Sequence, residues 1–131
     1  MRGQNNRLNG DNNTLIGINS TMVGNRNRAI GMNNMLLGDD NTITKGNDNR
    51  IKGSKNNMEG SRNTLVGDLN TVNGNSNTAA GSKNTIQGDD NNMIGDGNSI
   101  AGNNNTALGD DNAILGSTNA VDGNSNKIKG D

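Results

Sequence analysis

The chain has 131 residues, a net charge of -1 and 27% hydrophobic residues, and it contains no aromatic side chain, Cys or His. The absence of Cys excludes a disulfide framework, and the absence of Cys and His argues against a zinc or copper site. The low hydrophobic fraction by itself is typical of a disordered chain. No apolar run approaches the roughly 20 residues of a membrane helix. The first residues lack the apolar segment of a secretory signal, so we expect either an intracellular protein or one whose signal has been removed.

Glycine sets a strict period along the chain. It recurs every seven residues from Gly3 to Gly38 and again from Gly46 to Gly130, with one step of eight residues between Gly38 and Gly46. Each unit reads Gly-x-x-Asn-x-Φ-x, where Φ is aliphatic. Composition bias alone would not hold such a register, so the sequence predicts a single repeat domain over residues 1–131 whose function lies on a repeated surface.

A seven-residue period is also typical of a coiled coil, but each unit has only one apolar position and one Gly. A coiled coil needs two apolar positions with helix formers between them, and Gly costs about 1 kcal/mol at each helical position. A strand fits better, since Asn and Φ are two apart and point to one side while the x positions point to the other. Gly then supplies the turn. The sequence predicts an all-β parallel β-solenoid of about nine 14-residue coils, each built from two heptads.

The predicted strands bury one aliphatic residue each. In chain order these are Leu8, Leu15, Met22, Ala29, Leu36, Ile43, Ile51, Met58, Leu65, Val72, Ala79, Ile86, Met93, Ile100, Ala107, Ile114, Val121 and Ile128. The preceding inward position is Asn from Asn6 to Asn126, with Ser20 the only exception. A carboxamide is both donor and acceptor, so stacked Asn side chains can bond up and down a ladder, whereas stacked Asp would repel.

The extra residue of the eight-residue step lies near Thr44 and Lys45, and it predicts a bulge at a turn.

Alternate heptads place their outward residues on opposite faces. The first face carries Arg7/Asn9, Thr21/Val23, Met35/Leu37, Arg50/Lys52, Thr64/Val66, Thr78/Ala80, Asn92/Ile94, Thr106/Leu108 and Ala120/Asp122. The second carries Thr14/Ile16, Arg28/Ile30, Thr42/Thr44, Asn57/Glu59, Thr71/Asn73, Thr85/Gln87, Ser99/Ala101, Ala113/Leu115 and Lys127/Lys129. The first face pairs Thr with a short aliphatic residue more often, above all between Thr64 and Leu108. Such an array indicates a contact surface, although strand propensity alone also favours Thr, Val and Ile.

Stretches such as Gly10 to Ile16, Gly60 to Val66 and Gly81 to Gln87 resemble the x-x-Asn-x-Val-x-Gly repeats of grass ice-binding (ice-recrystallisation-inhibition) proteins. The resemblance covers nearly the whole chain. It implies a left-handed β-roll with two inner Asn ladders and one flat outer face that adsorbs to ice, and an extracellular location. The chain differs from that family in its mixed core and in the charged residues, such as Arg28 and Arg50, that interrupt its Thr column.

A weaker similarity links Gly17 to Val23 with the Gly-x-x-Ser-x-Ala heptads of trimeric autotransporter adhesin heads. It implies the alternative of a cell-surface structural β-roll that forms a trimer through one apolar face. Here Asn replaces Ser almost throughout, and the outward apolar residues alternate between faces.

Other functions fit the residues less well. We expect no enzyme, catalytic residue or cofactor, because a thin solenoid without His offers no cleft for convergent acid–base groups. The pairs Asp39-Asp40, Asp89-Asp90 and Asp110-Asp111 are typical of turns, and we expect no metal site there. The basic residues of the first half lack the net positive charge and the aromatic side chains that nucleic-acid binding favours, and we expect no membrane partner.

We therefore predict an antifreeze, ice-recrystallisation-inhibiting protein whose partner is the ice crystal surface and which is a monomer. The predicted ice-binding residues are Thr64, Val66, Thr78, Ala80, Asn92, Ile94, Thr106 and Leu108, with Thr21 and Val23 in support.

Overall fold

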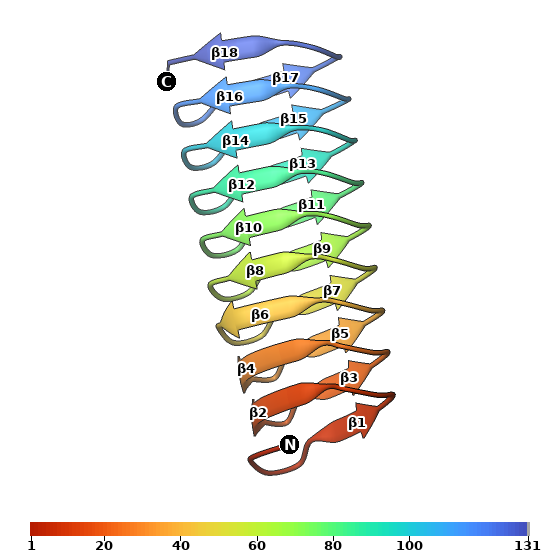
Figure 1. Ribbon diagram of the computed structural model, residues 1–131. Coiled ribbons are helices and arrows are strands. Elements are labelled where there is room, and N and C mark those ends of the chain that lie inside the picture. Colours follow the sequence, from red (N-terminus) through yellow and green to blue (C-terminus); the bar gives the residue numbers. More distant parts are fainter. Residues whose placement is uncertain (131) are drawn as a thin grey trace.

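The computed structural model describes residues 1–130, which form eighteen short strands and no helix. The strands stack as a flattened solenoid in which each coil contributes one strand to each side (Figure 1). We call β1, β3 and so on to β17 the odd sheet, and β2 to β18 the even sheet; each has nine parallel strands. None of the described residues forms a helix long and apolar enough to cross a membrane.

The strand bounds follow the predicted units. The odd sheet consists of β1 (Arg7–Asn9), β3 (Thr21–Val23), β5 (Met35–Leu37), β7 (Arg50–Lys52), β9 (Thr64–Val66), β11 (Thr78–Ala80), β13 (Asn92–Ile94), β15 (Thr106–Leu108) and β17 (Ala120–Asp122). The even sheet consists of β2 (Thr14–Ile18), β4 (Arg28–Met32), β6 (Thr42–Lys45), β8 (Asn57–Glu59), β10 (Thr71–Asn73), β12 (Thr85–Gln87), β14 (Ser99–Ala101), β16 (Ala113–Leu115) and β18 (Lys127–Lys129). The predicted solenoid of paired heptads is confirmed.

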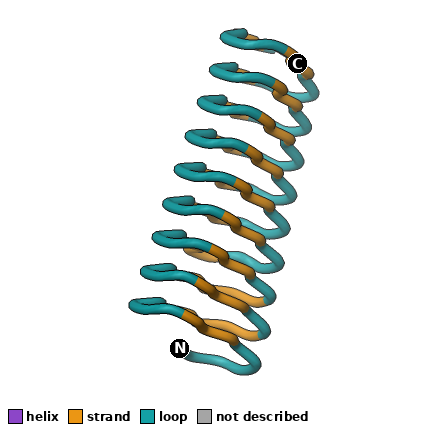
Figure 2. The backbone as a smooth tube through the Cα atoms, turned by 90° about the vertical axis from the view of Figure 1, so that its right-hand side faces the viewer, coloured by secondary structure: helices purple, strands orange, loops and turns teal. Residues whose placement is uncertain are grey.

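Two rows of turns connect the sheets along the edges of the solenoid (Figure 2). We call the turns that lead from an odd to an even strand forward turns, and those that lead back return turns. Most of the connecting turns have the same length, so most strand residues are stacked on the counterpart 14 positions along the chain, as Thr64 is on Thr78 and Thr78 on Asn92. Around the inserted residue the separation is 15, as between Met35 and Arg50.

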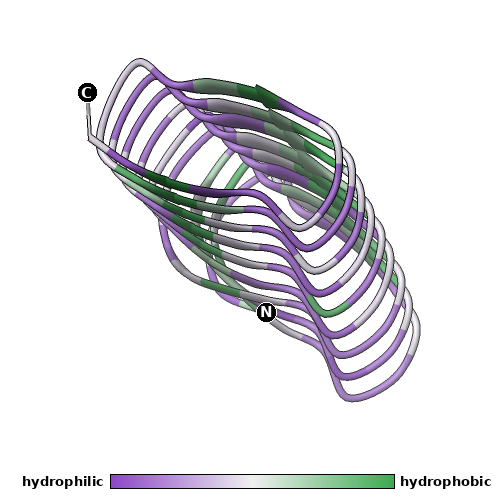
Figure 3. Cartoon of the chain, turned by 90° about the horizontal axis from the view of Figure 1, so that it is seen from above, coloured by the Kyte–Doolittle hydropathy of each residue, from purple (hydrophilic) through white to green (hydrophobic). Residues whose placement is uncertain are grey.

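The core is the predicted aliphatic column, one residue from each strand. From Leu15 to Val121 every member is buried. Viewed from above, hydrophobic segments recur from coil to coil on both sheets (Figure 3). Only the end coils leave this column open, with Leu8 37% exposed and Ile128 partly buried. These two residues have a neighbouring coil on one side only, so the fold depends on neighbouring coils for its burial.

The predicted Asn ladders lie on both sides of this core. The Asn77 Nδ2 donates to the carbonyl of Gly88 in the next coil at 2.7 Å, and its backbone N–H donates to the Asn63 Oδ1 at 2.8 Å. The ladders thus join side chain to backbone in every coil, and direct amide-to-amide bonds, such as Asn91 to Asn77 at 3.1 Å, supplement them. Every buried side-chain polar atom among the described residues has a partner. A ladder that satisfies each inward amide removes the cost of burying it.

Ser20 interrupts one ladder. Its Oγ accepts the backbone N–H of Asn34 at 3.1 Å and donates to the Ile18 carbonyl at 3.2 Å. A hydroxyl can take the acceptor role of the carboxamide, but it is too short to reach the glycine carbonyl of the next coil as Asn does. Ser20 therefore replaces only part of the hydrogen bonding that Asn provides at this position of the ladder.

The extra residue forms a bulge, as predicted, but it lies within a strand. Thr42 and Ile43 of β6 pair with Asn57 and Met58, and the register then shifts so that Lys45 pairs with Glu59. Lys45, and not Thr44 as expected, therefore occupies the second outward position of this coil. One inserted residue is accommodated because a bulge absorbs it before the turn begins.

Candidate functional site

The predicted contact surface lies on the odd sheet. Its main part, which we call the odd-face block, is the outer side of β9, β11, β13 and β15, whose strands pair in register. One row consists of Thr64, Thr78, Asn92 and Thr106, and the second of Val66, Ala80, Ile94 and Leu108. Val66, Ile94 and Leu108 are 42%, 47% and 36% exposed. The block therefore presents a polar row beside an apolar row over four consecutive coils.

The backbone beneath the block is regular. The N–H of Thr78 donates to the carbonyl of Asn91 at 2.9 Å, and the N–H of Asn92 donates to the carbonyl of Asn105 at 2.8 Å. The ladder residues that precede each strand are buried and bonded to the coil above and below. Because each strand is anchored on both sides, its two outward side chains start from a fixed and repeated backbone, which favours a flat array.

The two supporting residues lie on the same face but not in the block. Thr21 and Val23 belong to β3, and β5 and β7 separate them from β9. On β7 the outward residues are Arg50 and Lys52, both exposed. All ten predicted residues thus share one face, and a charged pair divides them into a pair near the amino terminus and a block of eight.

The even sheet offers a different surface. Its central strands carry Thr beside a long polar residue, as in Thr71 with Asn73 and Thr85 with Gln87. Its exposed large apolar residues lie near its two ends, with Ile16 40% and Leu115 53% exposed. No run of consecutive coils on this sheet combines a Thr row with an aliphatic row as the odd-face block does.

Sequence reasoning missed one apolar cluster. The strands β2 and β4 continue for two residues beyond the usual three, so Ile18 pairs with Met32 beside the pair of Ile16 and Ile30. The position after Gly was interpreted only as a turn position. The signal was present, because Ile18 and Met32 stand where the later return turns carry Asn, Ser or Asp.

The turns carry an ion pair on the outside of the solenoid. Arg26 Nε and Nη2 donate to the two carboxylate oxygens of Asp40 in the next coil at 2.6 and 2.8 Å. This hydrogen bond, with the guanidinium charge, lowers the pKa of Asp40, so the pair adds a stabilisation that is lost as the pH falls through that pKa. The pair is open to solvent, so its contribution is small, and it lies away from the odd-face block.

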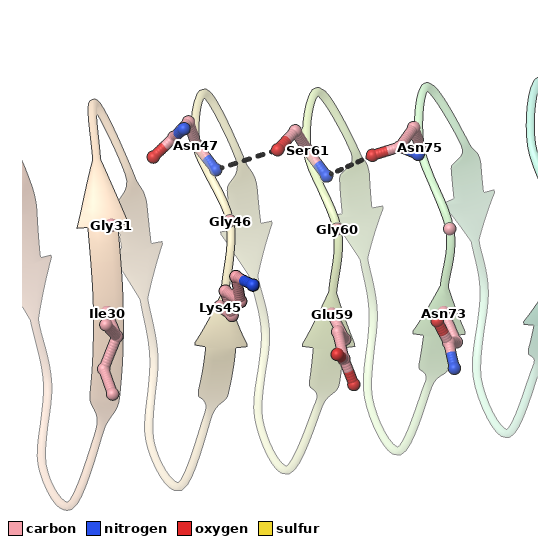
Figure 4. A pocket seen from close by; sticks show the side chains of 11 residues that line it. Ile30, Gly31, Lys45, Gly46, Asn47, Glu59, Gly60, Ser61, Asn73 and Asn75 are labelled. Atoms are coloured by element: carbon pink, nitrogen blue, oxygen red, sulfur yellow. Dashed lines mark hydrogen bonds between the residues drawn. The ribbon is translucent and has the colours of Figure 1, made fainter.

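A shallow groove of about 460 Å³ runs along the even sheet and the return turns (Figure 4). Lys45, Glu59 and Asn73 line it from the strands, and Asn47, Ser61 and Asn75 line it from the turns. The turn residues bond to one another, with the Asn47 N–H donating to the Ser61 Oγ and the Ser61 N–H to the Asn75 Oδ1. These polar groups connect adjacent coils. Within residues 1–130, no group of three or more His, Cys, Asp or Glu side chains could hold a metal ion.

Comparison with known proteins agrees with the geometry. The family model described as the grass antifreeze β-roll matches residues 1–88 and 27–116, which together span most of the chain. No curated protein matches the chain. Stacked coils of about 14 residues, an inner Asn ladder and this match lead to one conclusion: the chain belongs to the grass antifreeze β-roll family.

Proposed function

We propose that the chain inhibits ice recrystallisation by adsorbing to ice through the odd-face block. Ice binding is supported at the level of the family, which is not a known enzyme family. The observation that carries the choice of face is the register of Thr64, Thr78, Asn92 and Thr106 beside Val66, Ala80, Ile94 and Leu108.

The mechanism follows from the spacing of this array. Successive coils repeat the polar row and the aliphatic row at about 4.8 Å, and the two outward residues of one strand stand about 6.7 Å apart. Hydroxyls can hold water molecules in place while the neighbouring aliphatic groups leave no competing hydrogen bond, so water over the block is ordered before it meets the crystal. A rigid array loses little entropy on adsorption, which favours a face fixed from below by ladders.

Replacing Thr78 with Tyr tests the face. Thr78 lies in the middle of the block, and a phenol there would stand above the plane and hold neighbouring coils away from ice. We expect Thr78→Tyr to raise the concentration needed to arrest recrystallisation about tenfold or more, where each factor of ten corresponds to about 1.4 kcal/mol. The measurement is the growth of ice crystals during annealing of a frozen solution.

Thr85→Tyr is the matched control. Thr85 is an exposed Thr at the corresponding position of β12 on the even sheet, and we expect its replacement to leave activity unchanged. If Thr85→Tyr abolishes activity and Thr78→Tyr does not, the even sheet is the binding face. If the unmodified chain arrests no growth, the proposed function itself is wrong.

We expect the active species to be a monomer. One copy already presents the whole block, and adsorption to a flat crystal needs no partner chain. Sedimentation equilibrium should give the 13.6 kDa of a single chain. A trimer would instead support the adhesin-type alternative, in which one outer face is sealed between copies.

A further inference from the structure

Three Asn residues stand two positions before a Thr, in the triplets that begin at Asn12, Asn19 and Asn104. The third residues of these triplets are Thr14, Thr21 and Thr106. Asn-x-Ser/Thr is the acceptor sequence for N-linked glycosylation, which adds a bulky, soluble sugar chain at a protein surface.

The repeat restricts where such a triplet can arise. Two positions after each ladder Asn stands the core aliphatic residue, so a ladder Asn cannot begin the triplet. The residue just before the ladder position can, because two positions later comes the first outward residue of the strand. That position is the corner of the turn, where the backbone has a positive φ, with values of 57°, 54° and 56° at Asn12, Asn19 and Asn104.

The folded corners leave room for a sugar. All three Asn residues are exposed, and none of their side-chain amides hydrogen-bonds to another residue within 1–130. Asn33 occupies the same kind of corner with φ of 56°, but its Nδ2 donates to the Asp48 Oδ1 at 2.8 Å and Met35 stands two positions later. Ladder residues such as Asn105 are buried and bonded on both sides, and a sugar there would break the stack.

We propose that Asn12, Asn19 and Asn104 are acceptor sites for N-linked oligosaccharides, and that sugars at Asn19 and Asn104 control access to the odd face. In the transfer, the carboxamide Nδ2 forms a bond to the anomeric carbon of an oligosaccharide carried on a lipid pyrophosphate. The bond from that carbon to the pyrophosphate oxygen breaks, the pyrophosphate leaves with the electron pair, and the nitrogen gives up one proton to the transferase. The reaction precedes closure of the coil, and the exposed corner then accommodates the product.

The control of access rests on the proposed function and on the position of two of the sites. Asn19 and Asn104 lie in return turns, directly before β3 and β15, whose first outward residues are Thr21 and Thr106. A sugar chain at Asn104 is covalently held at the border of the odd-face block. Asn12 lies in a forward turn before β2, so its sugar borders the even sheet.

The experiment compares the full chain made in yeast behind a secretion leader with the same chain made in bacteria. Peptide mass spectrometry should find sugar on Asn12, Asn19 and Asn104 in the yeast product, with Asn33 bare as the internal control. The glycosylated chain should need about tenfold more protein to arrest ice recrystallisation, a loss of about 1.4 kcal/mol. Removing the sugars with an endoglycosidase should restore the bacterial value.

Asn→Asp variants separate the sites, since Asp occupies the same corner at Asp40, Asp90 and Asp111 with φ of 58°, 58° and 56°. The double variant Asn19→Asp with Asn104→Asp should restore activity to the yeast product, and Asn12→Asp should not.

Bare Asn at all three sites would overturn the acceptor assignment. Sugar at Asn19 and Asn104 with full activity would overturn the control of access. If the bacterial chain itself has no ice activity, the proposed function fails, the control of access fails with it, and the acceptor assignment is still decided by the mass spectra.

Discussion

Replacing Gly81 with Ala should cost more than about 4 kcal/mol or prevent cooperative folding, which places it among the largest effects of single substitutions. Gly81 has φ of +125°, and a Cβ there would lie 2.0 Å from the carbonyl oxygen of Gly95 in the next coil. That oxygen also accepts the Asn84 Nδ2 at 2.7 Å, so moving it away breaks the ladder as well. Urea unfolding followed by the strand signal in circular dichroism would measure the loss.

Gly97→Ala is the matched control one coil along. Gly97 has φ of +69°, and the nearest atom to an added Cβ is the Asp111 Oδ1, at the end of a flexible side chain. The other turns place a residue other than Gly at this corner, so we expect a cost of only about 1 kcal/mol. Equal losses in the two variants would show that turn conformation, and not the approach of neighbouring coils, fixes the repeated Gly.

Much of the fold could be predicted because the repeat fixes the environment of every position. The Φ column is apolar in each unit. Because the spacing between Gly and Asn is constant, the strand, the turn and the inward amide could be assigned together. The bulge was expected from the eight-residue step, but the sequence did not show that Lys45 would replace Thr44 in the register. Register within a bulge depends on which backbone bonds are kept, and a single sequence does not carry that information.

The turns were harder to predict than the strands. Corner residues as different as Leu69 and Thr118 both have a positive φ, of 61° and 63°, although neither favours it. Stacking imposes the conformation, since the Leu69 N–H donates to the Ser54 carbonyl in the preceding coil.

The choice of the ice-binding face remains a prediction. Both sheets have the same backbone, so the difference lies entirely in their outward side chains and in how these meet water.

Replacing Asn91 with Asp should cost about 3–5 kcal/mol at pH 7, as expected for a buried charge left without a counter-charge. The Asn91 Nδ2 donates to the Gly102 carbonyl at 2.8 Å, and its Oδ1 accepts the N–H of Asn105 at 3.0 Å. An aspartate keeps the acceptor but turns a negative oxygen toward a carbonyl oxygen, in a site that is 1% exposed. Burial and this repulsion both raise the pKa of the new carboxyl in the folded state.

The pH dependence identifies the cause of the loss. A raised pKa in the folded state means that the folded protein binds the proton more tightly. The part of the deficit that comes from the charge should therefore be absent below the unfolded pKa of about 3.9 and grow as the pH rises above it. Urea unfolding of both proteins from pH 3 to 7 measures this difference. Asn103→Asp is the control, since Asn103 is exposed and Asp occupies the corresponding turn position at Asp89 and Asp110. A deficit independent of pH, or one equal in the two variants, would mean that the inner ladder acts through packing and not through the neutrality of its amides.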